Sequence, residues 1–270
     1  PRSRRKSWKL LKRKRWTSSH LQPRLISPRS QTKLQRTKIK IWIIMGTSYS
    51  PNIVKDGLVF YADAANPRSY PGSGTTWFDL KGNNNGTLSS TPTFDTDAGG
   101  NFDFDGTDYI DIGAVTEMNS TTKMTISYWC KKSASNKDMV IGSQLSGTNG
   151  FWLQWYSDGN VYWNPRNGSS YSRSYALTYT SDWICLTGTY DGSLSQSNRC
   201  KTYVNGILVL DGTGTPPADF SSTAGNSFRI SGLGGSFYSD GNVASVQLYN
   251  SALSTQEVKQ NYNALKRRFI

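Results

Sequence analysis

From residue 53 onward the chain alternates short apolar runs with clusters of Gly, Asn, Asp and Ser. Within many runs the apolar side chains recur at every second position, which is the period of a strand with one buried face. Turn signals such as Ser-Asp-Gly-Asn, at 157–160 and 239–242, separate the runs. The predicted strands cover 57–64, 101–106, 109–113, 124–131, 139–145, 151–157, 161–164, 183–190, 200–210, 227–233 and 243–250. This spacing predicts an all-β fold, an antiparallel sandwich or jelly roll.

One helix is predicted, at the C-terminal end. Ser254 and Glu257 have the spacing of a capping box, in which each side chain bonds the other's backbone N–H. Apolar side chains then recur on one helical face, at Val258, Tyr262, Leu265 and Phe269. Basic residues follow near the end of this segment, where the helix dipole favours cations.

The positive charge of the chain is confined to its first 44 residues. They hold 15 of the 31 Lys and Arg and none of the 18 Asp and Glu, so residues 45–270 carry a net charge of −2. We therefore expect a basic, non-globular extension at 1–44 and one jelly-roll domain at 45–270, and no nucleic-acid binding by the domain. The favoured interpretation is that the extension is not a natural segment and results from translating the sequence upstream of the true start codon at Met45. The alternatives are a solvated tail and an arm for a polyanion.

Three cysteines do not form a disulfide framework, and we expect free thiols. Strand alternation places Cys185 and Cys200 on opposite sides of their sheet, where they cannot bridge. No apolar run approaches the ~20 residues of a membrane helix. The run at 41–45 is far too short and lacks the cleavage site of a signal peptide.

Four stretches in order resemble a concanavalin A-like jelly roll of the laminin-G-like type. They are residues 57–88, 102–113, 183–206 and 240–258, and the similarity spans about residues 53 to 265. The first stretch resembles the version found in structural proteins of tailed phages. Members of the superfamily that the chain resembles include lectins, adhesion modules, capsid or tail-fibre parts and some glycanases. The resemblance therefore indicates the fold better than the function. Related domains often carry an acidic pair where this chain has Ala244 and Ser245, which speaks against a metal site at that turn.

Catalysis is disfavoured by the carboxylates that the domain offers. A glycanase needs paired carboxylates on one face, but Glu257 belongs to the capping box and Glu117 has no acidic neighbour at strand spacing. The series Asp103, Asp105 and Asp111 is typical of turn chemistry. His20 lies in the extension, so the domain has no histidine base. We therefore expect that the protein is not an enzyme.

Three predicted strands have one apolar face that we expect to face the core: Met124, Ile126, Tyr128 and Cys130 in the first, Phe151, Leu153 and Trp155 in the second, and Val161 and Trp163 in the third. Their second face mixes aromatic side chains with amides and hydroxyls. Such faces bind sugars, because ring surfaces accept C–H patches while polar groups fix the hydroxyls. The alternative is that this face packs under the loop at 164–181 or against another subunit. The candidate carbohydrate-binding residues are Trp129, Trp152, Gln154, Tyr156, Tyr162, Asn164 and Arg166.

Aspartates at strand borders leave room for one cofactor, Ca²⁺, whose oxygen ligands would be Asp63, Asp79, Asp105 and Asp240. The sequence thus favours non-catalytic recognition of a glycan or cell-surface polysaccharide, on a phage-type virion or another extracellular surface. Its partners there would be other virion proteins. A purely structural capsid-decoration or fibre module without a sugar site is the alternative, and a glycan hydrolase comes third.

Overall fold

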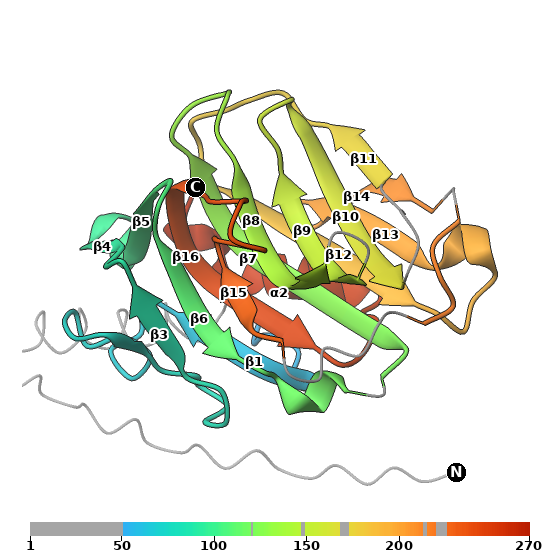
Figure 1. Cartoon of the computed structure of the whole chain (residues 1–270), viewed down its shortest axis with the longest axis horizontal. Coiled ribbons are helices and arrows are strands. Elements are labelled where there is room, and N and C mark those ends of the chain that lie inside the picture. Colours follow the sequence, from blue (N-terminus) through green and yellow to red (C-terminus); the bar gives the residue numbers. More distant parts are fainter. Residues whose placement is uncertain (1–50, 120, 147–148, 168–172, 213–214, 220–225) are drawn as a thin grey trace, which may run out of the picture. The chain divides into compact units, whose positions relative to one another are not determined.

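The computed structural model describes residues 51–119, 121–146, 149–167, 173–212, 215–219 and 226–270. The predictions about residues 1–44 fall outside this part of the chain. Within it, two antiparallel sheets pack face to face, and one short helix follows the last strand (Figure 1). The predicted fold class, an all-β jelly-roll sandwich with a C-terminal helix, is confirmed.

The first sheet has the order β14-β13-β12-β7-β16-β5-β4, and β1 also pairs with β16. The long strand β16 pairs with β7 along one edge, and with β5 and then β1 along the other. The strands are β1 (Leu58–Asp63), β4 (Thr93–Asp95), β5 (Asn101–Asp105), β7 (Lys123–Lys132), β12 (Ile184–Asp191), β13 (Cys200–Val204), β14 (Ile207–Asp211) and β16 (Asp240–Tyr249).

The second sheet has the order β11-β10-β9-β8-β15-β6-β3-β2. In Figure 1 its strands β8, β9 and β10 run side by side in green and yellow. The strands are β2 (Thr76–Trp77), β3 (Gly86–Ser89), β6 (Tyr109–Gly113), β8 (Met139–Ser146), β9 (Asn149–Trp155), β10 (Asn160–Asn167), β11 (Arg173–Ala176) and β15 (Phe228–Ile230).

Every predicted run contains a strand. The run at 200–210 is a hairpin of β13 and β14, turned by Asn205 and Gly206 at φ 51° and 73°. Four strands were not predicted from the sequence: β2, β3, β4 and β11. Each has two to four residues, which is too few to show a period of two.

The core between the sheets is formed by the apolar sets that alternation predicted. Both Trp155 and Trp163 are completely buried in it. The indole Nε1 of Trp163 donates to the carbonyl of Thr189 at 2.9 Å and so links the two sheets. Gly188 makes this approach possible, because a Cβ there would lie 2.6 Å from the Trp163 ring. The core-facing sides of β7, β9 and β10 are therefore as predicted.

The outer face of the first sheet is covered by helix α2 (Thr255–Leu265) and the 3-10 turn after it, Lys266–Arg268. Both bonds of the predicted capping box are present, so the helix begins where the sequence indicated. Val258 is buried against the sheet, as is one face of the helix. No helix that the structure describes has the length and apolarity needed to cross a bilayer.

The three cysteines are free and buried, as predicted. Cys200 lies in the core between the sheets, whereas Cys185 lies on the outer face of the first sheet. The predicted opposite facing of these two thiols is confirmed. Burial raises the pKa of Cys185 to about 11, which disfavours the thiolate form in the folded protein.

Candidate functional site

A hollow of about 240 Å³ opens on the outer face of the second sheet. Antiparallel pairing of β9 and β10 sets Gln154 opposite Tyr162 and Trp152 opposite Asn164. Because alternate residues share a face, these four side chains and Arg166 point away from the core. The hollow is lined by Trp152, Gln154, Tyr156, Tyr162, Asn164, Arg166 and Phe237. Six of the seven predicted sugar-binding residues therefore lie together.

Aromatic rings form two parts of the lining. Tyr156, just after β9, and Tyr162 are both half-buried, with ring centroids 6.1 Å apart in an edge-to-face arrangement. At the other end the guanidinium of Arg166 lies 4.5 Å from the Trp152 ring centre. Cation–π stacking of this kind fixes the direction in which the guanidinium fork points.

The floor of the hollow contains a polar group without a protein partner. Gln154 is 5% exposed, and its Nε2 makes no hydrogen bond in the described structure. A buried amide donor left in this state raises the free energy of the folded protein by roughly 1 to 3 kcal/mol. A ligand that accepts a hydrogen bond at this position would remove that penalty.

The charges beside the hollow are separated along β10. At its start, Tyr162 Oη donates to Asp158 Oδ2 at 2.6 Å, and this bond raises the pKa of Tyr162 to about 12. Burial works against ionisation of Asp158, but the bond from Tyr162 lowers the pKa of that carboxyl overall. Towards the end of β10, burial lowers the pKa of Arg166. A carboxylate thus lies beside one end of the hollow, whereas a guanidinium lines the other end.

Phe237 was missed in the sequence because it belongs to a loop between β15 and β16. It packs with Leu233 and Val140 around Trp152, which is only 6% exposed. Trp152 is therefore a wall of the hollow rather than the open platform that the sequence suggested. The two tyrosines present the more accessible rings.

Trp129 does not belong to this site, and its prediction was wrong. It lies on β7 in the first sheet, 3% exposed, between Tyr262 at 5.4 Å and Phe269 at 4.0 Å between ring centroids. Alternation correctly placed it on the outward side of its strand. It could not indicate that its sheet is the one that the C-terminal segment covers.

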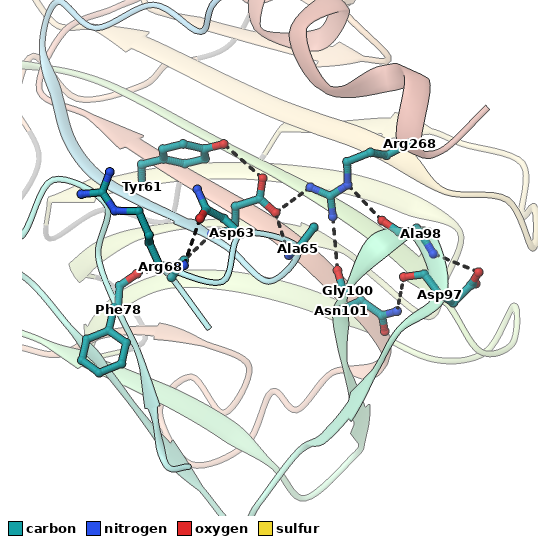
Figure 2. A network of polar contacts seen from close by, with 12 residues as sticks. Tyr61, Asp63, Ala65, Arg68, Phe78, Asp97, Ala98, Gly100, Asn101 and Arg268 are labelled. Atoms are coloured by element: carbon teal, nitrogen blue, oxygen red, sulfur yellow. Dashed lines mark hydrogen bonds and ion pairs between the residues drawn. The ribbon is translucent and has the colours of Figure 1, made fainter. Parts of the chain in front are cut away.

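The predicted calcium ligands are dispersed. Figure 2 shows Asp63 bound by Arg268, whose Nη1 lies 2.5 Å from Asp63 Oδ1. The same carboxylate accepts from the backbone N–H of Ala65 and from Tyr61 Oη. Arg268 also donates to the carbonyls of Ala98 and Gly100, so it ties the C-terminal end to the β4–β5 region (Figure 2). The surroundings of Asp63 are those of a structural ion pair.

The other three aspartates are engaged in the same way. Asp79 accepts backbone N–H bonds from four residues, among them Tyr61 and Lys81, and Asp105 accepts from Thr107. Asp240 forms an ion pair with Lys137 at 2.6 Å. In the described part of the chain, no three His, Cys, Asp or Glu residues gather in a way that could hold a metal ion.

The carboxylates considered for catalysis have structural contacts. Glu117 accepts from the side chains of Asn83 and Asn84, and Glu257 completes the capping box. Burial, followed by the charges of Asp240 and other aspartates, raises the pKa of Asp103 on the exposed side of β5. The hydrogen bond from Thr107 lowers the pKa of neighbouring Asp105, as the turn interpretation implied.

Two further hollows differ from the first in their chemistry. One, of about 430 Å³ on β3 and β6, contains Asp111, which is paired with Arg229 at 2.9 Å. The other, of about 300 Å³ beside β12 and β13, contains Asp191, which is paired with Lys123 at 2.9 Å. Neither is lined by a buried amide without a partner.

Solved structures share this architecture at low sequence identity. Domain 4 of an extracellular GH43 arabinanase from Geobacillus stearothermophilus, in complex with arabinotriose, has a TM-score of 0.58 at 17% identity, covering 77% of this chain and 100% of that one. A structure of botulinum neurotoxin type C has a TM-score of 0.56 at 12% identity, covering 77% of this chain and 51% of that one. Cell entry of that toxin depends upon interaction with two ganglioside molecules. Trypanosoma rangeli sialidase has a TM-score of 0.52 at 14% identity and coverages of 88% and 39%. The chain spans about half or less of the latter two proteins, and these likenesses establish the fold alone.

Among curated protein sequences, none matches this chain. A family model described as the concanavalin A-like lectin/glucanases superfamily matches residues 104–259, which is more than half of the chain. The matched region runs from β5 into α2 and includes both strands that build the hollow. The chain therefore belongs to the concanavalin A-like lectin/glucanase superfamily.

Proposed function

We propose that this chain is a non-catalytic carbohydrate-recognition module whose site is the hollow on β9 and β10. The observation that carries the proposal is the buried Gln154 amide, which lacks a partner on the floor of a hollow flanked by two tyrosine rings. The arabinotriose bound to the arabinanase domain supports a saccharide as the ligand of this fold. The structural contacts of Glu117 and Glu257 support a site without catalysis.

The lining matches the two surfaces of a sugar. Apolar C–H patches of a pyranose would lie on the accessible rings of Tyr156 and Tyr162. Its hydroxyls would accept from the Gln154 amide and exchange hydrogen bonds with Asn164, which is 2% exposed. Because the site holds no metal cluster among its described residues, we propose that binding is independent of Ca²⁺.

A glycan array probed with the full chain, with Ca²⁺ and with chelator, tests this function. Tyr156→Ala should weaken binding about two- to tenfold, as loss of one ring contact predicts. Tyr109→Ala is the matched control, because Tyr109 is also a half-buried tyrosine on the outer face of the same sheet. Equal affinity of the Tyr156 variant and the parent would contradict the site. A loss of saccharide binding confined to the Tyr109 variant would place the binding site in the β3–β6 hollow instead.

The setting of the module remains a separate proposal. On the resemblance of residues 57–88 to phage structural proteins, we place it on a virion, with cell-surface polysaccharide as its target and other virion proteins as neighbours. Antibodies against the chain should then label purified virions. Particles that lack the chain in immunoblots would refute this placement.

One observation favours a structural role as the second candidate. Strand β14 is an edge of the first sheet, and Ile207 on it is 68% exposed. Exposed apolar edges favour pairing with another chain. Ile207→Lys should then dissociate an oligomer in light scattering, whereas a parent protein that is already monomeric would argue against assembly through this edge.

A further inference from the structure

We propose that the β9–β10 hollow recognises a carboxylate-bearing sugar, a uronic or sialic acid, through the guanidinium of Arg166. This inference rests on the proposed function, because it names the class of saccharide that the same site takes.

The first support is the charge of the lining. Arg166 is the one formally charged side chain among the described residues that line the hollow, and the others are aromatic rings and amides. A neutral sugar would offer only its hydroxyl oxygens as acceptors for the guanidinium. A carboxylate offers two anionic oxygens in the plane that the guanidinium fork matches.

The second support is how the guanidinium is held. Stacking on Trp152 at 4.5 Å restricts its orientation, so less rotamer entropy is lost when an anion binds. Arg166 is half-buried, and this burial lowers its pKa. A partly desolvated cation attracts an anion more strongly than an exposed one, because water screens the pair less.

The third support is the arrangement of donors and charges along the strands. The unpartnered Nε2 of Gln154 lies opposite Tyr162, at the end of the hollow away from Arg166, and suits an acceptor oxygen of the ligand there. Asp158 bonds Tyr162 at the start of β10, about 13 Å along the strand from Arg166. The ligand carboxylate would therefore lie at the Arg166 end, with its hydroxyls towards the tyrosines.

The experiment compares matched acid and neutral saccharides with the full chain at about 0.15 M salt. The probes are trigalacturonate against its methyl ester, and sialyllactose against lactose, in titration calorimetry. At least one acid should bind about tenfold or more tightly than its neutral partner, as a charged hydrogen bond predicts. Arg166→Gln should abolish this preference, and Arg166→Lys should retain part of it.

Arg229→Gln is the charge-matched control, because Arg229 is on the outer face of the same sheet but outside the hollow. Thermal unfolding verifies that each variant folds. If Arg166→Gln does not fold, Arg166→Met replaces it, because the Met side chain keeps an apolar stem over Trp152. A preference that persists without Arg166 would overturn the inference and point to the basic residues 1–44. Equal binding of acid and neutral probes would overturn it while leaving the proposed function intact. Failure of every saccharide on the array would remove the proposed function as well.

Discussion

On the outer face of the first sheet Trp129 lies between Tyr262 and Phe269, and on that of the second Trp152 lies beneath Arg166. Both tryptophans are more than nine-tenths buried. The first is covered by the chain's own C-terminal segment, whereas the second is the wall of a hollow. Burial alone therefore does not distinguish a structural aromatic residue from one beside a binding site.

The buried amides of the two faces distinguish them better. Under α2, Asn261 accepts from the backbone N–H of Val54 at 2.8 Å and donates to Gln247 and to the Tyr249 hydroxyl. On the other face the Gln154 Nε2 has no partner. The amide under α2 thus receives its hydrogen bonds from the protein, whereas the amide of the hollow has a donor that an acceptor on a ligand would satisfy.

The largest effect that separates the faces is expected for Trp129→Ala. Removal of this buried ring should lower the free energy of unfolding by about 3 to 5 kcal/mol. It should also speed the labelling of Cys185, which shares the covered face. Denaturant unfolding and thiol labelling measure both. Saccharide binding should be unchanged at temperatures where the variant is folded, and a loss of stability below about 1 kcal/mol would show that the segment does not cover this face.

Asn261→Leu should have the next largest effect. The substitution leaves the buried Val54 N–H without its acceptor and removes the Asn261 amide that donates to Gln247 and to the Tyr249 hydroxyl, which costs roughly 2 to 3 kcal/mol. Gln256→Leu, an exposed amide on the same helix, serves as the control and should change stability little. Equal effects in denaturant unfolding would mean that the buried network does not stabilise the covered face.

Gln154→Met should act in the opposite direction. Without ligand it should raise the free energy of unfolding by up to about 1 kcal/mol, because it removes a buried donor that has no partner while conserving volume. It should also weaken saccharide binding. A clear loss of stability would indicate that Gln154 serves the fold, and the hollow would then lose its main support as a binding site.

The smallest effect concerns the exposed carboxylates of the first sheet. The pKa of Asp103 is raised in the folded state by burial and then by Asp240, so its charge destabilises the protein above that pKa. Asp103→Asn should therefore stabilise at neutral pH by less than about 1 kcal/mol, and the gain should vanish below about pH 4. Asp105, whose pKa is lowered by Thr107, is the control with the opposite sign. Urea unfolding at the two pH values tests the pair.

Much of the fold could be predicted because each of its signals is local. The strands longer than four residues showed their period, and Ser254 with Glu257 marked the start of α2. The inward set of β9, which includes Trp155, was correct for the same reason. Six residues of the hollow followed from two neighbouring strands joined by a short turn, so their pairing was also local.

By itself, then, the sequence determined which side of β7, β9 and β10 faces inward, because alternation is a property of consecutive residues. The tertiary structure decided which sheet each strand joined, and with it which outer face the C-terminal segment covers. Trp129 and Trp152 have the same local pattern, but they differ because Phe269 docks on one sheet and Phe237 flanks the other. Those contacts join residues far apart in the chain, and only packing of the whole domain brings them together.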